Sequence, residues 1–261
     1  MFGKSCSIIG AVHIHALPGA AGYKGNMEEI IERALSDATT YQKAGVDALV
    51  IENMHDVPYL KGYVEAETIA AMAVVANAIK RECHMPIGVQ ILAGANIEAL
   101  AVAHTSDLDF VRVEGFVYAH IGDEGIHEAS AAQIVRKRAA IKAEKVKIFA
   151  DIKKKHSSHA ITEDISLIET ATTAEFFKAD GVIVTGMRTG DAPPPSAVGE
   201  VKAAVKIPVL VGSGVTPDNI AAFAKYADAV IFGTYAKFDG NWINDVDSER
   251  VKRLVAAAHN Q

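Results

Sequence analysis

Residues 207–217 read IPVLVGSGVTP, and residues 228–236 read DAVIFGTYA. Each stretch begins with a β-branched apolar run without alternation of polar and apolar residues, as expected of a parallel strand buried on both faces. Each run ends in a turn of glycine and small hydroxyl residues, which leaves backbone N–H groups uncovered. Such donors near the start of a following helix suit a phosphate group. A tight bend from strand to helix would explain either turn alone, but two such turns after the last two strands are typical of the phosphate site of (β/α)8 barrels.

These two turns predict a phosphate site. The predicted ligands are Gly212, Ser213, Gly214, Gly233 and Thr234, together with the cation of Lys237. A further small polar turn follows the preceding apolar run, where Thr185 and Arg188 are available to an anion.

The rest of the chain repeats the same unit. Six earlier apolar runs begin near Ser7, Asp47, Pro86, Phe110, Lys147 and Gly181. Segments of helical periodicity alternate with the runs, over residues 27–44, 66–83, 96–103, 129–143, 163–178, 195–205, 217–224 and 248–259. Strands alternating with helices predict right-handed parallel crossovers, and eight units fit a closed barrel better than an open sheet. We therefore predict an α/β fold, a single (β/α)8 TIM barrel over residues 1–261.

Composition excludes several classes of protein. The net charge is −6 with acidic and basic residues interspersed, so no broad basic face is expected to bind nucleic acid. No run of 18 apolar residues occurs, so no membrane span is expected. Cys6 and Cys83 lack metal-binding spacing and fit a reducing compartment. We expect a cytoplasmic protein that forms a homo-oligomer. No cofactor is expected, but the binding of a divalent metal ion is left open.

Long loops mark one rim of the predicted barrel as the site. Connections from helix to strand are brief, whereas those leaving strands one, four, five and six are long and rich in Gly, Pro and His. In barrels of this kind the loops after the strands build the active site. Polar residues at the carboxyl ends of the strands are therefore the candidate functional residues.

The first three strands offer imidazole, carboxylate and amide groups. His13 and His15 alternate on the first strand, so both could face one metal ion, but we favour one substrate-contacting histidine and one that packs against a loop. Glu52 follows an apolar run and is interpreted as a general base, a metal ligand or the partner of a cation. Gln90 on the third strand has the same ambiguity, and both Asn53 and Gln90 are predicted to bind substrate.

Strands four and five add charged pairs. Arg112 and Glu114 share one face and predict either an ion pair or substrate contacts. Asp151 and Lys153 also share a face by alternation and predict a pair tuned for proton transfer, or a Schiff-base lysine. His156 lies in the loop that follows and is predicted to contact substrate. The run 153–155 would otherwise be a solvated basic segment, which suits Lys154 and Lys155 better than Lys153.

Motifs from Val12 to Gly240 occur in a specific order. They are residues 12–19 (VHIHALPG), 45–48 with 52–53, 57–59, 86–90, 110–114, 149–152, 212–217 and 236–240. In this combination the chain resembles the BtpA family, which includes SgcQ-like proteins described as predicted barrel enzymes. The resemblance implies the barrel fold. For function it implies either an enzyme of sugar metabolism, as for the SgcQ-like members, or a part in photosystem I accumulation, to which one photosynthetic member is linked.

The leading hypothesis is an enzyme acting on a phosphorylated small molecule, a sugar phosphate or nucleotide fragment. The predicted catalytic residues are His13, Glu52, Asp151 and Lys153. Isomerase, lyase and hydrolase chemistry all need a base beside an anion-stabilising group, so the reaction class stays open. The alternatives are a non-enzymatic assembly factor on an inherited barrel and a metal-dependent hydrolase. Ionisable residues at five strand ends favour an enzyme.

Overall fold

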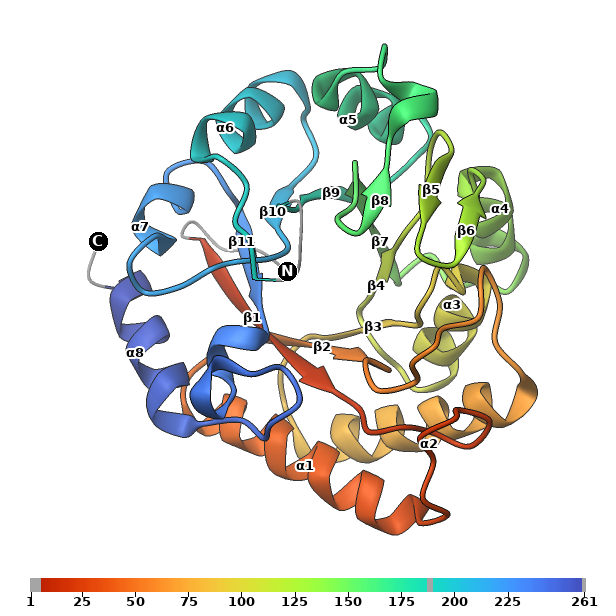
Figure 1. The fold of residues 1–261 in the computed structure, drawn as a ribbon, viewed down its shortest axis with the longest axis vertical. Coiled ribbons are helices and arrows are strands. Elements are labelled where there is room, and N and C mark those ends of the chain that lie inside the picture. Colours follow the sequence, from red (N-terminus) through yellow and green to blue (C-terminus); the bar gives the residue numbers. More distant parts are fainter. Residues whose placement is uncertain (1–5, 187–189, 260–261) are drawn as a thin grey trace.

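A computed structural model describes residues 6–186 and 190–259. Parallel strands form a closed barrel in the order β1-β11-β10-β9-β7-β4-β3-β2, and helices surround it (Figure 1). The barrel strands are β1 (Ser7–His13), β2 (Ala48–Glu52), β3 (Ile87–Gln90), β4 (Phe110–Val113), β7 (Lys147–Ile152), β9 (Gly181–Val184), β10 (Val209–Val211) and β11 (Ala229–Phe232). The predicted (β/α)8 fold is confirmed.

Seven helices connect successive barrel strands, an eighth follows the last strand, and together they cover the outside of the barrel in the described part of the chain. They are α1 (Met27–Lys43), α2 (Ala66–Glu82), α3 (Asn96–Thr105), α4 (Ala131–Ala140), α5 (Leu167–Phe176), α6 (Pro195–Ala204), α7 (Ile220–Phe223) and α8 (Ser248–His259). Helix α1 begins after Asn26, whose side chain caps it by accepting a hydrogen bond from Glu29 N at 3.3 Å. Helix α7 is one turn long, shorter than the predicted segment 217–224.

The barrel interior is built in layers. Alternate residues of a strand point inward, and the lower inward positions carry an apolar cluster that includes Ile9, Ala11, Val50, Phe110, Phe149, Ile183, Leu210 and Ile231. One step further along the same faces come His13, Glu52, Arg112 and Asp151, all buried. His13 is the register partner of Glu52 and Glu52 that of Gln90, so these three side chains lie level with one another. Arg112 is the register partner of Phe149, and its side chain reaches Asp151 one inward position further along. Together these groups form a polar layer above the apolar cluster.

Two loops at the carboxyl rim form a small antiparallel sheet. It contains β5 (His120–Gly122), β6 (Gly125–His127) and β8 (Ser157–Ser158), in the order β6-β5-β8. The sheet lies beside the barrel near α4 and α5 (Figure 1). The sequence indicated only long loops here, because strands of two or three residues are too short for a recognisable alternation. Short 3-10 helices η1 (Ala160–Thr162), η2 (Thr234–Ala236) and η3 (Phe238–Gly240) complete the rim.

Candidate active site

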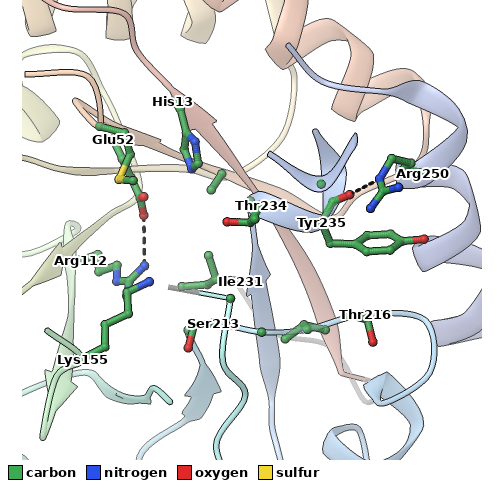
Figure 2. Close-up of a pocket in the computed structure, with 18 residues that line it drawn as sticks. His13, Glu52, Arg112, Lys155, Ser213, Thr216, Ile231, Thr234, Tyr235 and Arg250 are labelled. Atoms are coloured by element: carbon green, nitrogen blue, oxygen red, sulfur yellow. Dashed lines mark hydrogen bonds and ion pairs between the residues drawn. The ribbon is translucent and has the colours of Figure 1, made fainter. Parts of the chain in front are cut away.

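A cavity of about 220 Å³ opens at the carboxyl ends of the barrel strands. Ala11 and Ile231 of the apolar barrel interior line it. The other lining residues include strand ends and the turns that follow them (Figure 2). The lining includes His13, Glu52, Arg112, Lys155, Gly212–Thr216, Gly233–Tyr235 and Arg250. The rim predicted from loop lengths therefore carries the cavity, and both predicted glycine turns line it.

The two glycine turns present uncovered backbone donors. Within residues 6–186 and 190–259, the N–H groups of residues 213–215 and of residues 233–235 have no hydrogen-bond acceptor. The flanking groups are satisfied, since Gly212 N donates to Val184 O and Thr216 N donates to Asn219 Oδ1, both at 2.9 Å. Consecutive unpaired donors in two adjacent turns form a concave site suited to an anion.

The turn after β10 is fastened to the turn after β9. Ser213 Oγ donates to Asp191 O at 2.8 Å and accepts from Gly186 N at 3.0 Å. Gly214 has a φ of +66°, and a Cβ there would lie 2.2 Å from Ala192 N. The Ser213 hydroxyl thus holds the loops together, and glycine is required at position 214 by both backbone conformation and space.

Helix dipoles contribute little to this site. The predicted helix after the first turn is only α7, which starts at Ile220, and the second turn leads into the three residues of η2. Because a dipole needs several aligned peptide units, the backbone N–H groups themselves are the main electrostatic feature.

Arg250 is a cavity cation that the sequence did not indicate. It lies near the start of α8, donates from Nε to Tyr235 O at 2.6 Å, and holds its guanidinium 4.5 Å from the centre of the Tyr235 ring (Figure 2). These contacts fix it beside the second glycine turn. A lone arginine in a helix has no distinguishing pattern, so only the fold reveals this role.

Arg112 organises the polar layer of the barrel. Its Nε and Nη2 bind Asp151, with an Nη2–Oδ2 distance of 3.0 Å, and its Nη1 donates to Glu52 Oε1 at 3.1 Å. Of the two alternatives for Arg112 and Glu114, the ion pair between them is not formed, because carboxylates of neighbouring strands reach the guanidinium instead. Asp151 faces inward as predicted and holds Arg112. Burial raises the pKa of Glu52, with Arg112 opposing the effect.

The three lysines after β7 go to three different places. Strand β7 ends at Ile152, and Lys153 has a φ of +48°, so the alternation that predicted a shared face with Asp151 stops there. Lys153 Nζ donates to Thr162 O at 2.8 Å, away from His13 and Glu52. The prediction of a solvated face for the other two is also wrong. Lys154 is buried and paired with Glu114 at 3.2 Å, and Lys155 lines the cavity.

His13 contributes a neutral imidazole to the cavity. Its Nδ1 lies 3.2 Å from Trp242 O, and because a carbonyl only accepts, Nδ1 carries the proton and Nε2 has a free lone pair. Burial, together with the charge of Lys237, lowers the pKa of His13 well below its ordinary value. His15 lies elsewhere, stacked on His55 with ring centres 4.7 Å apart in a separate cavity. The two histidines therefore do not face one site: His13 lines the candidate site, and His15, which was predicted to bind substrate, lies outside it.

A second cavity adjoins the first and shares Glu52, Met54, Arg112 and Lys155 with it. Three predicted substrate-binding residues, Gln90, Glu114 and His156, line this second cavity. Gln90 Nε2 donates to Glu114 Oε1 at 3.2 Å, so the amide and the carboxylate form one network with Lys154. Its apolar wall includes Tyr59, Leu92 and Trp242.

Several predicted ligands serve the scaffold instead. Asn53 is fully buried and bridges Asp56 and Leu92 N. Lys237 is buried away from the turns, with its ammonium 2.7 Å from Asp37, so its prediction as a phosphate ligand is wrong. Thr185 Oγ1 accepts from Lys155 N at 3.1 Å and thereby positions that lysine. Arg188 lies outside the described residues.

Within the described part of the chain, no group of three or more His, Cys, Asp or Glu side chains is placed to hold a metal ion. Among the helices of that same part, none has the length and apolar character that crossing a membrane requires.

Fold and site together define a (β/α)8 barrel with a polar cavity and paired glycine turns at its carboxyl rim. The chain belongs to the BtpA family, whose model matches residues 4–260. An uncharacterized mitochondrial protein of Caenorhabditis elegans is 44% identical over 95% of this chain and 91% of its own length. The photosystem I biogenesis protein BtpA of Synechocystis is 32% identical over 96% of this chain and 87% of its own.

Solved barrels of other families share the fold. (S)-3-O-geranylgeranylglyceryl phosphate synthase from Thermoplasma acidophilum, in complex with its substrate sn-glycerol-1-phosphate, superposes with a TM-score of 0.62 at 18% identity. The match covers 99% of this chain and 95% of that one. Thiamine phosphate pyrophosphorylase from Pyrococcus furiosus gives a TM-score of 0.61 at 13% identity, covering 98% and 96%. At these identities the likeness shows the fold alone.

Proposed function

We propose that this barrel is an enzyme that binds a phosphorylated small molecule, a sugar phosphate or nucleotide fragment, and acts on it by acid–base chemistry. One observation carries the proposal: residues 213–215 and 233–235, whose N–H groups have no acceptor among the described residues, line one cavity. Arg250 beside these turns adds a positive charge. A phosphate group brings several acceptor oxygens to these donors, and its negative charge strengthens each hydrogen bond.

Two side chains suited to proton transfer line the same cavity as the turns. Glu52 has Oε1 bound to Arg112, while Oε2 has no hydrogen bond from a described residue. His13 directs an unprotonated Nε2 toward the turn at Gly233. A carboxyl group with a raised pKa and a neutral imidazole can give and take a proton from one bound molecule. Asp151 supports them by orienting Arg112, which in turn fixes Glu52.

Size and likeness of fold favour a small substrate. A cavity of about 220 Å³ has room for about seven water molecules at their liquid volume, which suits a phosphate and a few carbon atoms. Solved barrels of the same fold carry phosphorylated compounds in their names, among them sn-glycerol-1-phosphate and phosphoribosylanthranilate.

The proposal is tested by placing a negative charge at Thr234, whose side chain points into the cavity (Figure 2). Thr234→Asp should weaken binding of inorganic phosphate and of a sugar-phosphate panel at least about tenfold, because like charges roughly 4 Å apart repel by more than 1.4 kcal/mol in partly buried surroundings. Thr234→Asn has the same shape without the charge and should bind nearly as the parent does. Calorimetric titration measures both.

The alternative is an assembly role, as the name of the Synechocystis relative indicates for that protein. An assembly role requires no phosphate site. A parent protein that binds none of these phosphates, or a Thr234→Asp variant that binds them equally well, would overturn the proposed function. Turnover of one member of the panel, lost in Glu52→Gln, would establish the enzymatic part.

A further inference from the structure

Lys155 differs from its two lysine neighbours in having an uncommitted amine. Lys153 Nζ donates to Thr162 O, and Lys154 Nζ is paired with Glu114. Lys155 Nζ forms no hydrogen bond or ion pair with any residue in the described ranges. Its backbone is nevertheless held firmly, since Lys155 N donates to Thr185 Oγ1 at 3.1 Å. The structure thus places a free amine on an anchored segment.

This amine lies where the two cavities meet. Lys155 lines both, together with Glu52, Met54 and Arg112. Figure 2 shows its side chain running up to Arg112, across the cavity from Thr234 and the second glycine turn. A molecule whose phosphate sits in the turns would therefore pass Lys155 before its far end reaches Gln90 and Glu114.

The surroundings favour the nucleophilic form of the amine. Arg112 is a permanent cation, and its own carboxylate partners, Glu52 and Asp151, already bind it directly. Burial and the charge of Arg112 lower the pKa of Lys155, against the opposing effect of those carboxylates. A desolvated lysine beside another cation is a recognised way to obtain a reactive neutral amine.

We propose that Lys155 forms an imine with the carbonyl carbon of a phosphorylated ketone or aldehyde, an assignment that rests on the proposed phosphate site. The lone pair of Nζ attacks the carbonyl carbon, and a carbon–nitrogen bond forms as the carbon–oxygen π bond breaks. The oxygen then leaves as water, taking two protons, both supplied in net terms by the amine. Glu52 Oε2, at the same junction, relays a proton to the departing oxygen.

The imine explains why two cavities adjoin. The phosphate binds the glycine turns, the carbonyl carbon reaches Lys155, and hydroxyl groups beyond it meet Gln90 and Glu114. An imine draws electrons from the adjacent carbon, so a proton or a carbon fragment can be removed there with Glu52 or His13 as the base. The substrate class is accordingly a short oxo-sugar phosphate.

Reductive trapping tests this assignment. The full-length protein is incubated with dihydroxyacetone phosphate or D-ribulose 5-phosphate and then with borohydride, which reduces an imine to a stable secondary amine. Mass spectrometry should show one adduct per chain, heavier by the ligand mass less one oxygen, on Lys155. The peptide covering residues 153–155 contains its own controls. The amines of Lys153 and Lys154 are bound to Thr162 O and Glu114, so neither should carry the adduct.

Variants and a second ligand separate the possible failures. Lys155→Arg keeps a basic side chain of similar length but cannot form an imine, so it should lose the adduct while binding inorganic phosphate; Lys153→Met should keep the adduct. sn-Glycerol 3-phosphate, which has no carbonyl, should bind without trapping. Phosphate binding with no adduct at Lys155, or with adducts spread over surface lysines, overturns the imine and leaves the phosphate site standing. Failure of the parent to bind any phosphate overturns both.

Discussion

Gly233 leaves room for the imidazole of His13. A Cβ built on Gly233 would lie 2.7 Å from His13 Nε2, closer than any real contact allows, and 3.3 Å from Ala11 Cβ. The glycine that opens the second turn therefore also sets the position of a candidate catalytic base. The phosphate turn and the acid–base residue are coupled through this one missing side chain.

Gly233→Ala should accordingly displace His13 and disturb the turn. We expect phosphate affinity to fall about tenfold, since a donor turn shifted by a few tenths of an ångström loses hydrogen bonds worth roughly 1.5 kcal/mol to a charged ligand. Phosphate titration measures the affinity, and imidazole NMR signals report the displacement. Gly62→Ala is the control, because its Cβ would meet nothing within 4 Å although its φ is +77°. Equal affinities in the two variants would contradict the coupling.

Arg112 should matter more for stability than any surface cation. Arg112→Met leaves Glu52 and Asp151 unpaired, with side chains only 7% and 2% exposed. Removing one partner of a buried ion pair costs about 3–5 kcal/mol of unfolding free energy. The loss should shrink as the pH falls, because protonation removes the stranded charges. Urea denaturation measures the change.

A surface pair supplies the control for Arg112. Lys252→Met removes an ion pair with Glu249 whose side chains are 54% and 74% exposed. Its effect should stay within about 0.5 kcal/mol. If Arg112→Met were no more destabilising than Lys252→Met, the arginine would not organise the polar layer.

Strand alternation explains which site residues the sequence could predict. On β1, β2 and β4 the inward face reads apolar until the last inward position, where His13, Glu52 and Arg112 stand. A parallel strand buried on both faces tolerates such residues only at its open end, so their placement follows from the pattern. The glycine turns are predictable for the same reason, since each directly follows an apolar run.

The residues that alternation could not place lie beyond strand ends. A positive φ at Lys153 turns the chain through the left-handed region, so no period relates Lys155 to Asp151. Lys237 has a buried carboxylate partner 200 positions away in sequence, Asp37, which no local pattern reveals. Arg250 reaches the cavity only because α8 packs beside η2.

Lys237 and Arg250 provide a direct comparison of the predicted and the observed cation. Arg250→Met should reduce affinity for inorganic phosphate, because its guanidinium lines the cavity. Lys237→Met should leave that affinity within about twofold of the parent but lower the unfolding free energy, because it strands Asp37. Titration and urea denaturation on both variants separate the effects. Affinity lost only in Lys237→Met would restore the assignment made from sequence.

Three histidines cluster at the small antiparallel sheet of β5, β6 and β8, and this cluster should make the fold sensitive to acid. His120 stacks on His127 with ring centres 5.0 Å apart and lies 5.6 Å from His159. His120 Nε2 is buried with no hydrogen-bond partner among the described residues. Burial, followed by the charge of Lys154 and the two neighbouring histidines, lowers the pKa of His120 from 6.5 to about 3.

His120→Phe should therefore flatten the acid branch of the stability curve. Between pH 6.5 and about 3 the unfolded chain protonates His120 while the folded chain does not. The unfolded state then binds more protons, so stability falls as the pH falls, by at most about 1.4 kcal/mol per pH unit for this group. Phenylalanine keeps the stacking surface and removes the titration. Urea denaturation across this range should show the variant losing less stability than the parent. His84→Gln, which removes an exposed histidine, should follow the parent, and a His120→Phe curve parallel to both would contradict the assignment.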